Sequence, residues 1–144
     1  MGTFKHILAA TDFSEASRPA LDLAITIARD SGADLTVVHT CEIPPCPDPA
    51  LVDLITPLAD IARTKLDALL GAARSVCPRT TGVLNVGVAW EQILAVAAEA
   101  KSDLIILGTH GRRGVARAFI GSVAERVVRL SPIPVLTVRS RVAG

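Results

Sequence analysis

Apolar and polar positions follow two different periods along this chain, one typical of strands and one typical of helices. Short apolar runs predict five strands, at residues 4–10, 34–40, 82–88, 103–107 and 133–138. Apolar positions that recur every three or four residues predict four helices between them, one ending at Ser31-Gly32 and the others at 50–76, 91–100 and 122–130. Pro19 is expected in the first turn of the first helix, with Ser14 or Ser17 as the cap.

Strands that alternate with helices in this way indicate an α/β protein with a parallel sheet. The run DLIIL at 103–107 is continuously apolar, as is typical of a strand buried on both faces. No linker or repeat divides the chain. We therefore expect one domain, residues 1–144, built on a single doubly wound five-stranded parallel sheet with helices on both faces.

The long helix predicted at 50–76 carries an apolar stripe. Its members are Leu51, Leu54, Ile55, Leu58, Ile61, Ala62, Leu66, Leu69 and Leu70. We expect the stripe to cover one face of the sheet rather than to serve as a membrane or partner surface. Pro57 should kink this helix or displace its start, and the proline-rich residues 41–49 before it should form a loop.

Pro132 and Pro134 stand at the start of the last predicted strand and place it at an edge of the sheet, because proline cannot donate to a ladder. The apolar residues 135–138 would then offer an open edge for pairing with another chain. A homodimer through this C-terminal edge strand is the expected result.

Composition and charge narrow the classes of protein. Half of the residues are apolar but only 3% are aromatic, so the core must be aliphatic. Three cysteines and no secretory segment predict a reduced, cytoplasmic protein, and no apolar run reaches the 18 residues that span a membrane. From Leu104 onward there are seven arginines and one acidic residue, which favours an anionic ligand or a solvated basic face. Nucleic acid is not expected, because aromatic stacking platforms are missing.

The residues that point to chemistry follow the fourth predicted strand. Gly108, Gly111 and Gly114 are each separated by two residues, and Gly121-Ser122 opens the last helix. Glycines let backbone N–H groups approach an anion closely, and a helix N-terminus attracts negative charge. In an open parallel sheet, ligands bind beyond the carboxyl ends of the strands, where the winding reverses. This segment therefore predicts a phosphate site.

The glycines alone are also compatible with a tight turn. They do not form a Walker loop, because no Gly-Lys-Ser/Thr ending follows, and their GxxGxxG spacing is not the GxGxxG dinucleotide fingerprint. Three nearby arginines, Arg112, Arg113 and Arg117, would supply positive potential around a phosphate.

Taken together, Gly108-x2-Gly111-x9-Gly121-Ser122 resembles the nucleotide-binding signature of the universal stress protein family, G-x2-G-x9-G-(S/T). The segments ILAATDFS (7–14), VHT (38–40), DLIILG (103–108) and PIPVLTV (132–138) are similar to that family as well, in order and over nearly the whole chain. The resemblance implies a Rossmann-like, HUP-type sheet of strand order 3-2-1-4-5, with a crevice between the first and fourth strands. It also implies ATP binding, which members without this glycine spacing generally lack.

The resemblance further implies roles for individual residues. Asp12 would meet the ribose, or a Mg²⁺ ion near the phosphates. The adenine would lie beside Ala10, Leu107 and the backbone of Thr40. Phosphates would be held by Gly108, Gly111, Gly121, Ser122 and Val123, with Arg112 close to them.

Two residues depart from the pattern of the family. Ala10 stands where ATP-binding relatives often carry proline, which would loosen the base pocket. Trp90 stands where relatives often have proline before the third helix, which would affect packing only.

Other candidate groups have simpler interpretations. Asp12, taken alone, suits a turn or a helix cap, and His39 at a strand end suits a structural role. His110 lies in the glycine loop without an evident carboxylate partner. His39, Cys41 and Cys46 fit no standard zinc spacing, and the chain lacks the G-x-S-x-G elbow of a serine hydrolase. No catalytic residue is assigned.

The expected function is that of a regulatory module in stress response, in which bound ATP, with or without Mg²⁺, changes the conformation or a partner surface. Two alternatives remain open. One is a slow Mg²⁺-dependent ATPase or nucleotidyl-transfer enzyme, and the other is a sensor that binds cAMP or AMP.

Overall fold

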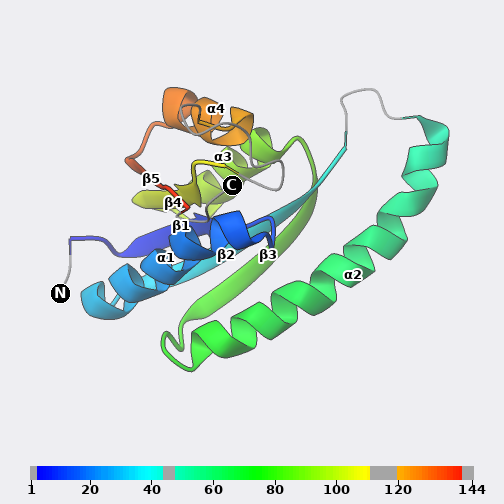
Figure 1. Cartoon of the computed structure of the whole chain (residues 1–144). Coiled ribbons are helices and arrows are strands. Elements are labelled where there is room, and N and C mark those ends of the chain that lie inside the picture. Colours follow the sequence, from blue (N-terminus) through cyan, green and yellow to red (C-terminus); the bar gives the residue numbers. More distant parts are fainter. Residues whose placement is uncertain (1–2, 44–47, 111–119, 141–144) are drawn as a thin grey trace.

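The computed structural model describes residues 3–43, 48–110 and 120–140. Within them the chain forms, in order, β1 (His6–Ala10), the 3₁₀ turn η1 (Glu15–Ser17), α1 (Arg18–Ser31), β2 (Asp34–Glu42), α2 (Pro49–Arg74), β3 (Thr80–Gly87), α3 (Ala89–Glu99), β4 (Leu104–Gly108), α4 (Ser122–Leu130) and β5 (Val135–Val138). The strands make one parallel sheet of order β3-β2-β1-β4-β5, which confirms the expected fold class and strand order (Figure 1).

Helices cover both faces of this sheet. Figure 1 shows α3 and α4 on one face and α1 and α2 on the other. Side chains of β1 alternate between the two layers: Ile7 and Ala9 pack with α1 and α2, while Leu8 packs with α3 and α4. Because β1 and β4 are central and covered on both sides, nearly every one of their positions is apolar.

The start and end of α1 follow the signals in the sequence. The hydroxyl of Ser14 accepts a hydrogen bond from the Ser17 N–H at 3.2 Å in η1, and Pro19 occupies the first turn of the helix. Gly32 ends the helix with φ of 68°, in the left-handed region that glycine adopts without strain. Ser17 is the N-cap residue of α1 but its side chain makes no capping bond, and Ser14 caps the preceding turn η1 instead.

The loop predicted for 41–49 is shorter than expected. Cys41 and Glu42 belong to β2 and pair with Val86 and Gly87 of β3. The hydrophobic pattern missed this extension because Glu42 is exposed and the four prolines that follow mark the region as irregular. β2 therefore reaches further than β1 at the carboxyl edge of the sheet.

The N-terminus of α2 begins at Pro49, where Asp48 Oδ1 accepts a hydrogen bond from the Ala50 N–H at 2.9 Å. Pro57 therefore lies inside the helix and does not displace its start. Figure 1 shows the first turns of α2 running in a different direction from the rest, as the lost backbone hydrogen bond at an internal proline would cause.

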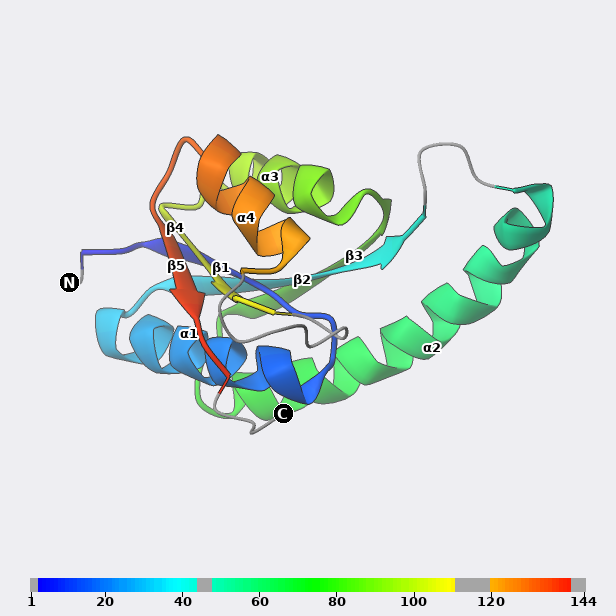
Figure 2. The same cartoon turned by 45° about the horizontal axis from the view of Figure 1, so that its top comes forward.

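The expectation that the whole apolar stripe of α2 covers the sheet is wrong. Only its C-terminal half does so, through Ala62, Leu66, Leu70 and Ala73. Leu54, Leu58 and Ile61 are each more than half exposed. The reason is length: α2 is 26 residues long, and its N-terminal half extends past the sheet (Figure 2).

β5 is an edge strand, as the two prolines predicted. It begins at Val135, later than expected, and the Pro134 carbonyl still accepts a hydrogen bond from the Ile105 N–H at 3.0 Å.

No helix in the described part of the chain is both long and apolar enough to cross a bilayer.

Candidate functional site

The winding of the sheet reverses between its two central strands. After β1 the chain passes to α1 on one face, and β4 leads toward α4 on the other. The crossovers after β1 and β4 therefore lead to opposite faces of the sheet, and ligands of open α/β sheets usually bind beyond the carboxyl ends of two such strands. The predicted residues at 10–12 and 107–108 stand at this point.

Asp12 closes the turn that follows β1. Its Oδ1 accepts hydrogen bonds from both the N–H and the hydroxyl of Ser14, at 2.9 Å from the nitrogen. The turn and cap role considered for this residue is thus present. It also fixes the carboxylate just beyond the carboxyl end of β1.

His39 secures the same turn from β2. Its Nδ1 donates to the Thr11 carbonyl at 2.8 Å, and its ring lies against that of Phe13 with centroids 4.3 Å apart. Phe13 itself has φ of 66°, a strained value for an aromatic residue. The structural interpretation of His39 is therefore confirmed, and its buried ring positions the residues around Asp12.

The residues expected around the adenine lie on three adjacent strands. Ala10 at the end of β1 is half-buried, and Leu107 of β4 is buried. On β2, the Thr40 hydroxyl donates to Asn85 Oδ1 of β3 at 2.7 Å. Trp90 packs into the α3–α4 layer, so its departure from the family pattern concerns packing.

Gly108 and Gly121 are needed for close backbone approach. A Cβ at Gly108 would lie 3.3 Å from the carbonyl oxygens of Ala16 and His110. A Cβ at Gly121 would lie 3.0 Å from the carbonyl oxygen of Thr109, which also accepts a hydrogen bond from the Gly121 N–H. Gly108 therefore lets η1 pack closely against the end of β4, and Gly121 lets the start of α4 pack closely against Thr109.

The N-terminus of α4 has no side-chain cap. Gly121 is the N-cap residue, and it has no side chain with which to satisfy the first N–H groups of the helix. Ser122 is exposed and Val123 half-buried in the first turn. An uncapped first turn beside the crevice provides donors and positive potential for an anion. Gly111 and Arg112, as well as Arg113 and Arg117, lie outside the described residues.

The comparisons with known proteins agree with this geometry. The model of the universal stress protein family matches residues 3–139. This chain belongs to the universal stress protein family. A universal stress protein of Thermus aquaticus is 37% identical over 143 residues, covering 94% of this chain and 99% of the relative.

Solved structures of universal stress proteins share the architecture. The universal stress protein UspA from Lactobacillus plantarum superposes with a TM-score of 0.83 at 27% identity, over 96% of this chain and 100% of the other. A universal stress protein crystallised in complex with cAMP superposes with a TM-score of 0.65 at 26% identity, over 94% and 97% of the two chains.

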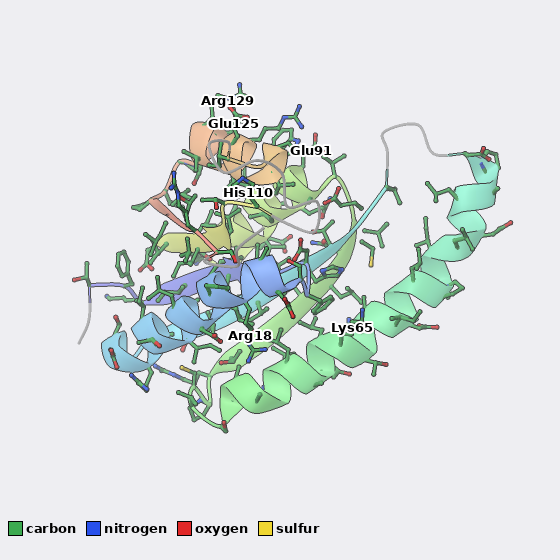
Figure 3. All side chains as sticks on the ribbon, in the orientation of Figure 1. Arg18, Lys65, Glu91, His110, Glu125 and Arg129 are labelled. Atoms are coloured by element: carbon green, nitrogen blue, oxygen red, sulfur yellow. The ribbon has the colours of Figure 1, made fainter. Side chains whose placement is uncertain are left out.

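One side chain of this universal stress protein stands out beside the glycines. His110 Nδ1 lies 3.1 Å from the hydroxyl of its neighbour Thr109. Its Nε2 is buried and makes no hydrogen bond with the described residues. Figure 3 shows the ring near the start of α4. No carboxylate partner was evident in the sequence, and none is recorded in the described structure.

Sequence reasoning missed a groove on the other face of the same turn. It lies between η1, α1 and α2, and Phe13, Arg18 and Lys65 are among its lining residues. The groove is formed by two segments about fifty residues apart, so no local pattern in the sequence could reveal it.

Among the described residues, no group of three or more His, Cys, Asp or Glu side chains could hold a metal ion.

Proposed function

We propose that this universal stress protein is a regulatory module that binds an adenine nucleotide, with ATP as its ligand, in the crevice between β1 and β4. The observation that carries the proposal is the uncapped N-terminus of α4, whose N-cap residue Gly121 packs against Thr109 directly after β4, at the point where the winding of the sheet reverses. Phosphate oxygens placed there would satisfy N–H groups that no side chain caps.

The proposed arrangement assigns the ligand in three parts. Adenine lies beside Ala10, Leu107 and the Thr40 backbone. Asp12 meets the ribose, or a Mg²⁺ ion bound through the phosphates, and the first turn of α4 with Gly108 receives the phosphates. Gly111 and Arg112 complete the phosphate site in this proposal. The Asp12 carboxylate suits Mg²⁺ as a hard oxygen ligand, and any such ion would be held mainly by the nucleotide.

cAMP is the second candidate ligand, because a structurally similar universal stress protein has been crystallised with it. A helix N-terminus accepts one phosphate as well as three, so the geometry of α4 alone does not choose between ATP, AMP and cAMP. Titration of the three nucleotides against the same protein would rank them, and ATP is expected to bind most tightly.

Ser122→Asp provides the sharpest test of the site. Asp at the exposed first position of α4 favours the helix by about 0.3–1 kcal/mol through its charge near the helix N-terminus. The same carboxylate repels a bound phosphate. We therefore expect ATP affinity to fall at least about tenfold while the free energy of unfolding is unchanged or higher.

Ser122→Asn is the matched control, since it has the same shape without the charge and should retain most of the affinity. Calorimetric titration with ATP and urea unfolding measure the two effects. Equal affinities of the Asp and Asn variants would contradict the proposed phosphate position. Gly121→Asp is a poorer test, because any Cβ at Gly121 would crowd the Thr109 carbonyl.

We also propose a homodimer formed through β5 in the cytoplasm. Its support is the edge position of β5, whose residues are half-buried rather than covered. An apolar edge of this kind pairs readily with a second copy of itself.

A further inference from the structure

The groove between α1 and α2 has the size of a small-molecule site. Its volume is about 410 Å³, within the roughly 300–1,000 Å³ that such sites occupy. The lining residues come from the β1–α1 turn and from one face of each helix: Thr11, Phe13, Ser14, Ser17, Arg18, Leu21, Lys65, Ala68, Leu69 and Ala72. None of them is among the residues proposed to contact the nucleotide.

The lining is polar at one end and apolar at the other. On α2 it runs from Lys65 through Leu69 to Ala72, at the spacing of residues that share one helix face. On the other wall it runs from Ser14 and the start of α1 to Leu21, again over seven residues, or about 10 Å. Figure 3 shows Arg18 and Lys65 in the space between the two helices.

The polar end carries positive charge. Lys65 Nζ lies 5.9 Å from the centroid of the Phe13 ring and makes no ion pair with the described residues. Arg18 uses its Nε to bind Asp22 at 3.1 Å, and its other guanidinium nitrogens remain as donors. The lining includes no carboxylate. An anionic group would therefore be attracted to this end.

The hydroxyls at this end already bond to one another. Thr11 Oγ1 and Ser17 Oγ are 3.2 Å apart, and Ser17 Oγ donates to the Ser14 carbonyl at 3.0 Å. Recognition of an anion would thus rest on Lys65 and Arg18. At the other end, the lining residues Leu21, Leu69 and Ala72 are all aliphatic and carry no polar side-chain atom.

We propose that this groove binds an aliphatic carboxylate, with its head group at Lys65 and Arg18 and its chain along Leu21, Leu69 and Ala72. The ammonium of Lys65, which makes no ion pair within the described part of the chain, and a guanidinium shared with Asp22 balance a single negative charge better than the several charges of a polyphosphate. The apolar floor suits a hydrocarbon chain and would leave the hydroxyls of a sugar without partners. The proposal is independent of nucleotide binding.

The experiment titrates the full chain with octanoate and follows backbone amide chemical shifts. Octanoate is expected to shift the amides of the groove residues. Octanol lacks the charge and acetate lacks the chain, so each should bind at least about tenfold more weakly than octanoate. Lys65→Met keeps the helix propensity and apolar stem of lysine, and should weaken octanoate binding about tenfold. Arg63→Met removes a charge from the same helix outside the groove and should change the affinity less than about twofold.

Ala68→Leu tests the apolar part, because it fills the groove from an exposed position with another strong helix former. It should abolish octanoate binding and leave the unfolding transition in place. The proposal is overturned if octanoate shifts no groove amide, or if Lys65→Met and Arg63→Met bind it equally. It is also overturned if octanol binds as tightly as octanoate, which would make the groove a general apolar surface.

Discussion

His39 Nδ1 donates to the Thr11 carbonyl oxygen at 2.8 Å, and this bond joins the body of β2 to the first residue after β1. We expect His39→Ala to lower the free energy of unfolding by roughly 2–4 kcal/mol, because it leaves a buried carbonyl without a donor and removes the ring packed on Phe13. Since the same turn holds Asp12, ATP affinity should fall as well.

Urea unfolding and ATP titration of the His39 variant measure both effects. His6→Ala is the control, because the contact of His6 Nδ1 with Asp34 is 3.6 Å long and exposed, and its loss should cost less than about 1 kcal/mol. Equal destabilisation by the two changes would show that the bond to Thr11 does not stabilise the turn.

The two halves of α2 should respond differently to the same substitution. Leu66→Ala removes a fully buried side chain and is expected to cost about 2–5 kcal/mol. Leu58→Ala removes a side chain that is 53% exposed, and should change stability by about 0.5 kcal/mol or less. Chemical denaturation of both variants checks the difference. A large loss of stability on Leu58→Ala in the monomer would mean that the Leu58 side chain is buried against other residues.

Thr137 offers a direct test of the proposed dimer. The Pro134 carbonyl accepts a hydrogen bond from Ile105 of β4, and the Val138 carbonyl accepts one from Thr109 directly after β4. The alternating residues Val135 and Thr137 therefore direct their backbone groups to the open edge. Thr137→Pro would remove an outward N–H and keep the ladder to β4. Sedimentation velocity should show a dimer for the native chain and for Thr137→Val, and a monomer for Thr137→Pro. A native chain that stays monomeric at high micromolar concentration refutes the dimer.

Cys77 gives a defined pH dependence. Burial raises the pKa of its thiol above the ordinary value of 9.0, with a smaller opposing effect of Arg29. The unfolded chain therefore loses this proton at a lower pH than the folded chain does. The stabilisation from Cys77 is fully present below pH 9.0 and is lost as pH rises from there toward the folded pKa.

Cys77→Ala should accordingly make the fall in stability above pH 9.0 less steep. Urea unfolding between pH 7 and pH 10.5 measures the slope, and the chain contains no tyrosine whose titration would add to it. An identical slope in the two proteins would mean that the thiol does not contribute. The Sγ of Cys77 also donates to the Ile25 carbonyl at 3.3 Å, so a uniform loss of stability across the pH range is expected in addition.

The sequence was sufficient for the sheet and its helices because the signals there are local. Pro19 lies in the first turn of α1 and Gly32 ends the helix in the left-handed conformation, as predicted, whereas Ser14 caps the preceding turn η1 rather than α1 itself. The apolar run at 103–107 predicted a strand covered on both sides, and β4 is central. The predicted ends of segments differed more from the structure. At Cys41 and Glu42, pairing with β3 extends β2 into a region that the prolines marked as a loop.

Features set by distant contacts could not be predicted in this way. The periodicity of α2 is the same in both halves, yet only the part that overlies the sheet is buried, because coverage depends on where the sheet ends. For the candidate site, the pattern predicted that Asp12 follows the first strand, that Gly108 ends the fourth strand and that Gly121 precedes the last helix, as the structure has them. It could not show that Gly121 is also needed for its contact with the Thr109 carbonyl.

The turn at residues 11–17 separates the groove from the proposed nucleotide site. Thr11 and Phe13 line the groove toward α2, and Asp12 between them belongs to the proposed nucleotide site. A ligand in the groove that displaces this turn would alter the affinity of the protein for the nucleotide. By thermodynamic linkage, the nucleotide would then change the affinity for the groove ligand by the same factor. Two titrations of one ligand, with and without the other, would give the sign of this coupling.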